Sequence, residues 1–352
     1  MGAGESIAIQ TKFNRSNDFY FVGEQISGNI LFQNDHDRLK LDEIFVELVG
    51  ELGYKTQESR SSTDSNGNST TEHYTEYHHI PFLTLTVLLA RPNNKQHKMS
   101  LSRGTYRWPF EFSLPENLPP SSAPNNEAYP HIKYYTRVVF DRPWYKRNIT
   151  QTHLLTISPR INLLRRNDLQ ETFAFADQNR KRLRLQCCLF RGGIMPGQLL
   201  SFQINLHNPE QSKIKKIEAT FIQYRKTAVD SHNETIFSVD LPGLSEFDEL
   251  HLQRSFDLLV PNTYLTPTYT FTTSYHGYSH HITVHYELKL KVKSHGIFTK
   301  IEVNIPVIVG TEAVPEQQQQ QQNYDMIMPT NISPDFNENN APPSYETVVK
   351  NK

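Results

Sequence analysis

Apolar and polar residues alternate along most of this chain, and this period of two residues strongly limits how the chain can fold. The pattern is clearest between Gly104 and Leu114, where polar or proline residues separate the apolar side chains of Tyr106, Trp108, Phe110, Phe112 and Leu114. Successive side chains of a β-strand point to opposite faces, so this alternation predicts one buried face and one solvated face. Similar segments occur at 7–13, 26–32, 44–48 and 132–140, and none has a sustained helical period. We therefore expect an all-β protein.

A second series of alternating segments follows in the other half of the chain, at 202–206, 217–221, 282–292 and 301–305. Turn residues separate the short strands of both series, a spacing that is typical of β-sandwiches. A chain of 352 residues has room for two domains of about 150 residues and a tail. We expect two tandem immunoglobulin-like β-sandwich domains, the first over residues 1–158 and the second over residues 181–311.

Three segments depart from the strand pattern. Residues 55–75 are rich in Ser, Thr, Glu and Asn and have almost nothing to bury, which predicts a long mobile loop inside the first domain. Residues 159–180 are interpreted as a basic connector between the domains. Residues 312–352 contain the glutamine run Gln317–Gln322 and few large apolar side chains, so we expect a disordered tail.

Charge and cysteine content argue against several classes of protein. Lys and Arg total 36 and Asp and Glu total 37, so no overall field attracts nucleic acid, and no nucleic-acid partner is expected. Cys187 and Cys188 are adjacent and cannot close a stabilising loop, which favours a reducing compartment. Residues 1–10 lack the apolar core of a signal peptide, and no segment approaches the roughly 18 apolar residues of a membrane span. We expect a cytoplasmic protein.

Six motifs occur in a fixed order along the chain: Gly23–Ile30; Gly104–Pro115 with Leu118–Pro119; Ile132–Tyr135 through Asp141–Trp144; Gly193–Gln198; Asn208–Pro209; and Ile305–Thr311. Together they resemble the motifs of the α-arrestins, which are arrestin-domain-containing trafficking adaptors. The resemblance implies an N-terminal and a C-terminal arrestin sandwich. We expect the glycines of these motifs to serve backbone turns, and the aromatic residues Trp108 and Trp144 to fill a core rather than to carry chemistry.

The tail contains a candidate binding motif, because Pro342, Pro343 and Tyr345 fit the Pro-Pro-x-Tyr pattern of WW-domain ligands. The two prolines favour a polyproline II ridge that docks on an aromatic groove, and the tyrosine fills a neighbouring pocket. The resemblance implies that this motif recruits a WW-domain HECT (Nedd4-type) ubiquitin ligase. It also implies that the arrestin domains hold a membrane receptor or transporter as cargo, at the periphery of the plasma membrane and endosomes. Only one such motif is present, so the roughly 10²-fold gain from two linked motifs is lost.

A second candidate site is basic. Basic residues greatly outnumber acidic ones around the connector, and the set comprises Arg142, Lys146, Arg147, Arg180, Lys181, Arg182 and Arg184. Such a surface could hold phosphorylated cargo tails or an anionic lipid surface. The structural alternative is a solvated strap between the domains, with arginines on many faces.

Three weaker signals complete the candidates. Gly2 with Ser6 matches the myristoylation pattern, although a single acyl chain binds membranes only marginally, at about 10⁴ M⁻¹. Four histidines lie close together, but neighbouring strand residues face opposite sides, so we expect surface hairpin residues at His276, His280, His281 and His285. We expect the cysteines to lie in a strand as buried thiols, and we expect no metal and no cofactor.

Other functional classes remain open. We find no phosphate loop, Gly-x-Ser-x-Gly, His-Glu-x-x-His or dinucleotide motif, so the chain is not expected to be an enzyme. A retromer-like arrestin-fold sorting or scaffold subunit would use the sandwiches for assembly without recruiting a ligase. An extracellular adhesion protein of tandem immunoglobulin-like domains is a further alternative, which the missing signal sequence and missing cysteine pairs disfavour.

Overall fold

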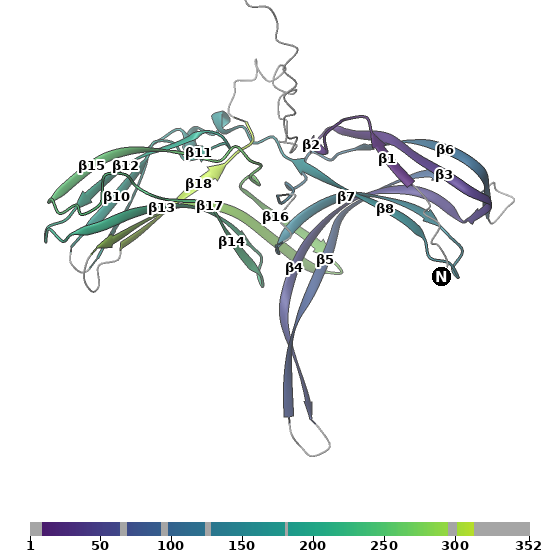
Figure 1. Cartoon of the computed structure of the whole chain (residues 1–352), viewed down its shortest axis with the longest axis horizontal. Coiled ribbons are helices and arrows are strands. Elements are labelled where there is room, and N and C mark those ends of the chain that lie inside the picture. Colours follow the sequence, from purple (N-terminus) through teal and green to yellow (C-terminus); the bar gives the residue numbers. More distant parts are fainter. Residues whose placement is uncertain are drawn as a thin grey trace, which may run out of the picture.

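A computed structural model describes residues 9–63, 69–92, 98–123, 128–179, 182–294 and 301–312. Figure 1 shows two β-sandwiches side by side, with one long ribbon projecting from the region where they meet. The described residues contain no α-helix. The prediction of an all-β chain with tandem sandwiches is therefore confirmed.

The first sandwich is built from β1 (Ile9–Phe13), β2 (Phe19–Phe21), β3 (Gln25–Leu41), β4 (Glu43–Thr63), β5 (Ser69–Ala90), β6 (Met99–Ser113), β7 (His131–Asp141) and β8 (Ile149–Ser158). Its two sheets have the strand orders β1-β3-β6 and β2-β8-β7-β4-β5. On β6, Phe110 and Phe112 are buried, whereas Arg107 and Glu111 are exposed. The alternation in the sequence thus corresponds to the two faces of the sheet.

The second sandwich is built from β9 (Phe173–Gln178), β10 (Arg184–Leu189), β11 (Gly193–Ile194), β12 (Leu199–His207), β13 (Ile214–Lys226), β14 (Ser231–Asp240), β15 (His251–Leu259), β16 (Tyr269–Tyr275), β17 (Tyr278–Ser294) and β18 (Ile301–Val309). One sheet has the order β15-β12-β10-β9. The other has the order β11-β18-β17-β13-β14, and β16 pairs with β17. Inward side chains from both sheets, such as Phe202 and Leu288, join one apolar core.

The predicted mobile loop at residues 55–75 is wrong for the residues that the structure describes there. β4 and β5 continue as an antiparallel pair from Tyr54 opposite His78 to Thr63 opposite Ser69. Pairing between β4 and β7 ends at Gly53, so beyond that residue the ribbon has two strands. We call residues 54–63 and 69–78 the β4–β5 arm, and Figure 1 shows it projecting away from both sandwiches.

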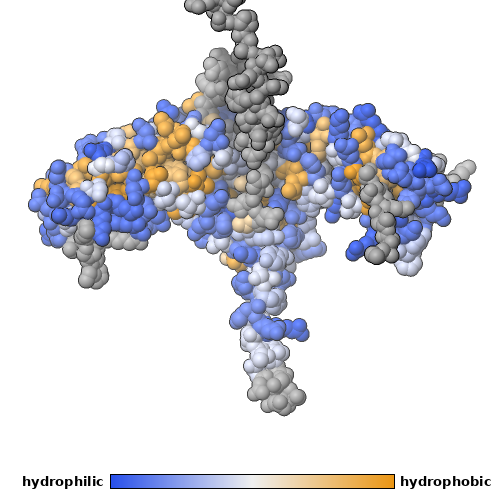
Figure 2. Space-filling model, viewed as in Figure 1, coloured by the Kyte–Doolittle hydropathy of each residue, from blue (hydrophilic) through white to orange (hydrophobic). Residues whose placement is uncertain are grey.

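Polar cross-strand pairs explain why the arm is extended although it buries little. Hydrogen bonds join Thr56 Oγ1 to His78 Nε2 at 2.9 Å and Ser62 Oγ to Thr70 Oγ1 at 3.0 Å. Such pairs stabilise a sheet without an apolar face, and threonine favours extended backbone. In Figure 2 the projecting arm is mostly pale to blue, with little orange. A pattern that looks for one apolar face therefore cannot detect these strands.

Part of the predicted connector belongs to the second sandwich. Residues 173–178 form β9, which pairs antiparallel with β10. The preceding link contains two short 3-10 helices, η1 (Leu163–Arg165) and η2 (Asn167–Leu169). Residues following β18 hold this link, because Thr311 N donates to Ile161 O at 3.1 Å and Leu163 N donates to Glu312 O at 2.9 Å. The link is therefore fixed against the second sandwich.

The β16–β17 hairpin crosses from the second sandwich to the first. Ile282 lies on β17, but it is fully buried in the apolar core of the first sandwich. Phe271 of β16 packs against Phe82 of β5, with ring centroids 4.9 Å apart. In Figure 1 the β16–β17 hairpin lies beside β4 and β5. The two sandwiches therefore share apolar packing where they meet.

Candidate functional site

Several predicted site residues lie outside the residues that the structure describes: Gly2, Arg180, Lys181, Pro342, Pro343 and Tyr345. The myristoylation site and the WW-domain ligand therefore stay predictions. Nearly all of the predicted tail, residues 312–352, lies outside the described residues as well.

The structure does not gather the predicted basic residues into one patch. Arg142, Lys146 and Arg147 lie in the turn between β7 and β8 of the first sandwich. Arg182 and Arg184 lie at the start of β10 in the second sandwich. Figure 1 shows β8 and β10 in opposite halves of the molecule. The described residues of the set therefore form two separate basic regions.

The connector arginines mostly serve structure. Arg160 forms ion pairs with Glu24 at 3.3 Å and with Glu312 at 2.8 Å, and its guanidinium lies 3.9 Å from the centroid of the Phe21 ring. It thereby joins the first sandwich to the residues after β18. Arg166 pairs with Asp168 at 2.6 Å, and this hydrogen bond lowers the pKa of the Asp168 carboxyl. These two connector arginines therefore make structural contacts.

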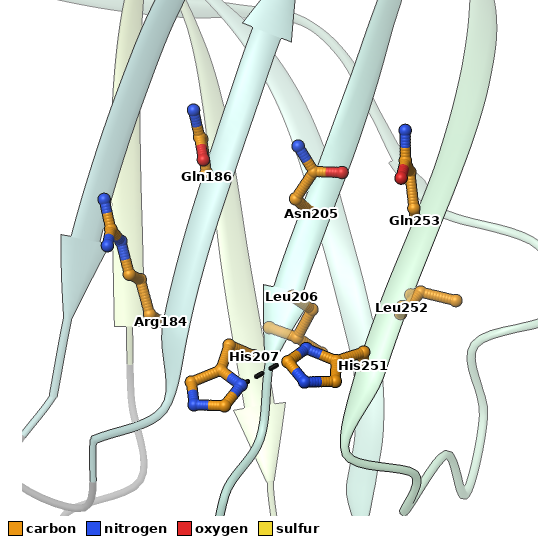
Figure 3. Close-up of a pocket in the computed structure, with 8 residues that line it drawn as sticks. All are labelled: Arg184, Gln186, Asn205, Leu206, His207, His251, Leu252 and Gln253. Atoms are coloured by element: carbon orange, nitrogen blue, oxygen red, sulfur yellow. Dashed lines mark hydrogen bonds between the residues drawn. The ribbon is translucent and has the colours of Figure 1, made fainter.

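Arg184 lines a shallow pocket of about 410 Å³ on the β15-β12-β10-β9 sheet (Figure 3). Antiparallel registers place Arg184 opposite His207 and His207 opposite His251, and the Nδ1 atoms of the two imidazoles are 3.3 Å apart. The adjacent cross-strand row adds three carboxamides, those of Gln186, Asn205 and Gln253. No carboxylate is among the lining residues. The pocket therefore offers hydrogen-bond donors to an anionic group.

A buried polar network lies where the sandwiches meet. Arg225 of β13 is 1% exposed, and its Nη1 donates to the Ala128 carbonyl of the first sandwich at 3.2 Å. Burial lowers the pKa of this guanidinium, and Glu234, at 3.9 Å, partly offsets that effect. The Tyr264 hydroxyl donates to the Ser121 carbonyl at 2.9 Å. These bonds fix the orientation of the two sandwiches and contain no activated nucleophile.

Trp144 is not a core residue, which corrects the sequence prediction. Its side chain is 94% exposed at the β7–β8 turn. Trp108, in contrast, stacks on Tyr106 with centroids 5.6 Å apart and contacts Phe140 at 5.9 Å, as expected of a scaffold residue. The signal that could have separated the two tryptophans is the proline directly before Trp144, because proline favours the first positions of a turn.

The remaining candidates have structural positions. Cys187 is buried, and burial raises the pKa of its thiol to about 12, so the thiol is neutral. Cys188 is half-buried rather than buried. The four histidines lie on the β16–β17 hairpin; His276 and His281 are exposed as predicted, whereas His280 and His285 are half-buried. His280 Nδ1 is 3.4 Å from the Tyr54 hydroxyl of the arm. Among the described residues no group of three or more His, Cys, Asp or Glu side chains could hold a metal ion.

Comparison with known families agrees with this architecture. The family description "Arrestin (or S-antigen), N-terminal domain" matches residues 9–164, and "Arrestin (or S-antigen), C-terminal domain" matches residues 179–314. The chain belongs to the arrestin family. It is also similar to Arrestin domain-containing protein 17 of Caenorhabditis elegans, with 30% identity over 133 residues. That match covers 38% of this arrestin and 30% of the relative's length.

Family membership gives the functional class at a coarse level. Arrestin-family proteins are typically non-enzymatic adaptors that bind cargo and trafficking machinery. Its described residues include no helix of the length and apolarity needed to span a membrane. The ligase, the cargo and the membrane location go beyond what the family match supplies.

Proposed function

We propose that this arrestin links a membrane receptor or transporter to a WW-domain HECT ubiquitin ligase, and so promotes ubiquitination, endocytosis and endosomal sorting of that cargo. The order of the domains and of the tail motif along the chain is the main support for this proposal. Two arrestin sandwiches precede a tail that contains Pro342, Pro343 and Tyr345 in the Pro-Pro-x-Tyr spacing. The prolines favour the extended ridge that a WW groove accepts, and the tyrosine adds the second anchor.

The two ends of the molecule have different tasks in this proposal. The sandwiches hold cargo, and the tail holds the ligase. The protein then acts at the cytoplasmic periphery of the plasma membrane and endosomes and brings an enzyme to its substrate without chemistry of its own. The buried network around Arg225 supports this assignment, because it joins the sandwiches into a scaffold and presents no catalytic group.

Binding of the full-length protein to an isolated WW domain tests the ligase contact. Tyr345→Ala removes the anchor of the motif, and we expect affinity to fall at least tenfold, by roughly 1.4 kcal/mol or more. Tyr324→Ala is the matched control, because Tyr324 is a tail tyrosine without a proline pair directly before it. Equal binding by wild type and Tyr345→Ala would refute the ligase contact.

Cargo turnover in cells separates this proposal from the sorting-subunit alternative. If the motif recruits a ligase, Tyr345→Ala should leave the protein on its cargo but reduce cargo ubiquitination. A retromer-like subunit would keep its sorting activity after deletion of the whole tail.

Phosphorylation of Tyr345 should block binding of the WW domain, since it forces charge into an apolar pocket.

A further inference from the structure

The turn between β7 and β8 holds two aromatic side chains in solvent. Trp144 and Tyr145 occupy the corner positions of a β-turn that is closed by a 2.7 Å hydrogen bond from Lys146 N to Pro143 O. Trp144 is 94% exposed, the highest value among the exposed large apolar residues of the described chain, and Tyr145 is 57% exposed. The two rings contact each other edge to face, with centroids 5.8 Å apart.

This turn has a defined conformation. Pro143 is buried, and its ring fixes the backbone where the chain leaves β7. The Asn148 side chain closes the other side, because its Oδ1 accepts a 2.9 Å hydrogen bond from Arg142 N. A tryptophan carries roughly 150–250 Å² of surface that gains free energy when it leaves water. A rigid turn that holds such a side chain outward therefore presents a binding group.

Basic residues flank the two rings in the sequence, and one further cation lies over the Tyr145 ring. Arg142, Lys146 and Arg147 belong to the turn itself, and Lys98 Nζ lies 5.8 Å from the centroid of the Tyr145 ring. None of these four cations forms an ion pair with an acidic side chain among the described residues. Lys98, Lys146 and Arg147 are exposed and can face an external anionic surface, whereas Arg142 is half-buried with its Nε shielded from solvent.

The strand ends beneath the turn carry side chains of both charges. The registers of β3 with β6 and of β4 with β5 and β7 bring the ends of these strands to the same end of the sandwich as the turn. Lys40 and Arg91 are exposed there. The acidic residues of this end lie at the strand termini and not on the turn: Asp42, Glu43 and Asp141. The turn itself, residues 142–148, contains aromatic and basic side chains and no acidic one.

We propose that the β7–β8 turn is a membrane anchor that places Trp144 and Tyr145 in the headgroup region of an anionic bilayer. Tryptophan and tyrosine favour this interface because their rings are apolar and their polar atoms stay hydrated. Basic residues next to the surface add attraction to anionic lipids, roughly fivefold in binding for each residue. The anchor does not depend on the ligase-binding tail, and either could fail without the other.

A bilayer fits this site better than a phosphorylated peptide does. Recognition of a phosphate group on a peptide needs donors that converge on one point. Here the two rings occupy the corners of a turn, and the basic residues lie on both sides of them in the sequence, Arg142 before and Lys146 and Arg147 after. A flat, diffusely charged surface matches this arrangement. Binding to a bilayer also explains why the aromatic residues lie at the corners of the turn, where they enter the headgroup region first.

Fluorescence of the full-length protein tests whether Trp144 enters the lipid. The chain contains two tryptophans, so Trp108→Phe leaves Trp144 as the single reporter. Protein from a bacterial host excludes any contribution from an acyl chain on Gly2. With phosphatidylcholine vesicles that contain phosphatidylserine, we expect the emission to shift to shorter wavelength and brominated lipids to quench it. Pure phosphatidylcholine vesicles should give a much smaller change.

Vesicle sedimentation in the wild-type background measures the contribution of each group. Lys146→Ala with Arg147→Ala should weaken binding roughly 30-fold, and Trp144→Ala about tenfold. Tyr278→Ala is the aromatic control, because Tyr278 is 73% exposed next to the turn of the β16–β17 hairpin. Lys213→Ala with Lys215→Ala is the charge control on the other sandwich, because both lysines are exposed at the start of β13. Both controls should change binding less than about twofold, since they leave the local attraction intact.

Three results would overturn the proposal. The Trp144 emission could stay unchanged while the protein still sediments with vesicles, which would assign binding to another surface. The control variants could lose as much binding as the turn variants. The protein could ignore vesicles and bind a phosphorylated peptide in a manner that requires Lys146 and Arg147, which would assign the turn to a protein ligand.

Discussion

Two hairpins of this arrestin leave their own sandwich, and they end in opposite environments. The β4–β5 arm extends into solvent, whereas the β16–β17 hairpin packs on the neighbouring sandwich. Both are antiparallel ribbons with continuous backbone pairing. The backbone bonds alone therefore do not decide where a ribbon lies. The side chains that it can bury make the difference.

The residues of the two hairpins show this difference. Ile282 and Phe271 bring apolar surface from the second sandwich onto the first, and Ile282 is fully buried. The arm instead exposes Tyr74 and carries serine and threonine pairs that hydrogen-bond across the ribbon. We therefore expect changes in the β16–β17 hairpin to lower the stability of the whole molecule, and changes in the arm to remain local.

The largest effect is expected for Ile282→Ala. This change removes a fully buried side chain from the core that the two sandwiches share, and such losses cost about 2–5 kcal/mol. The free energy of unfolding, measured by chemical denaturation of the full-length protein, should fall by that amount. His281→Ala is the control, because the adjacent exposed residue should change it by less than about 0.5 kcal/mol. Similar values for both variants would contradict a shared core.

A smaller effect is expected at the base of the arm, where His131 of β7 packs against Gly53 of β4. Burial lowers the pKa of the His131 imidazole to about 3, and the charge of Lys133 lowers it further. The Ala128 backbone opposes this shift, and the charges of Arg225 and His79 add smaller lowering effects. The folded pKa is below the unfolded value near 6.5, so the unfolded chain binds the proton first. Stability is therefore lost as pH falls from about 6.5 toward 3.

At pH 5 the lowered pKa of His131 reduces the free energy of unfolding by about 2 kcal/mol relative to neutral pH. We expect His131→Asn to reduce the fall in unfolding free energy between pH 7.5 and pH 5 by that amount. His276→Asn changes an exposed histidine of the other hairpin and should keep the wild-type pH dependence. If His131→Asn and wild type lost stability in parallel, His131 would not be the group that titrates.

The same contrast explains how much of the fold the sequence could predict. Alternation revealed β6 and β17, because each buries one apolar face. The arm has no apolar face to reveal, so residues 55–75 were expected to be a loop. Residues 173–178 were assigned to the connector because a short strand at the edge of a sheet could not be recognised among the surrounding basic residues. Pairing between polar strands depends on register, which composition does not encode.

The candidate surfaces were predictable only in part. The sequence identified Arg142, Lys146 and Arg147 as basic, but it grouped them with Arg184 from the other sandwich. His207 and His251 are 44 residues apart, and only the register of β12 with β15 brings them together. The exposure of Trp144 followed from turn geometry, while the usual location of tryptophan suggested a core. Contacts between distant segments can be predicted only when the fold is known, whereas the charge of a residue can be read from the sequence alone.

The smallest effect is expected for shortening the arm. Replacing residues 58–74 by Asn-Gly joins Gln57 to Thr75, which already face each other in the register, through a turn that suits a two-residue hairpin. The deleted residues pair mainly with each other, so we expect the free energy of unfolding to change by less than about 1 kcal/mol. Gln57 and Thr75 are hydrogen-bonded at 3.0 Å in the full-length arm, so the new end keeps a native pair. A loss as large as that of Ile282→Ala would mean that the arm stabilises the core, and the two hairpins would then not differ in the way that their side chains indicate.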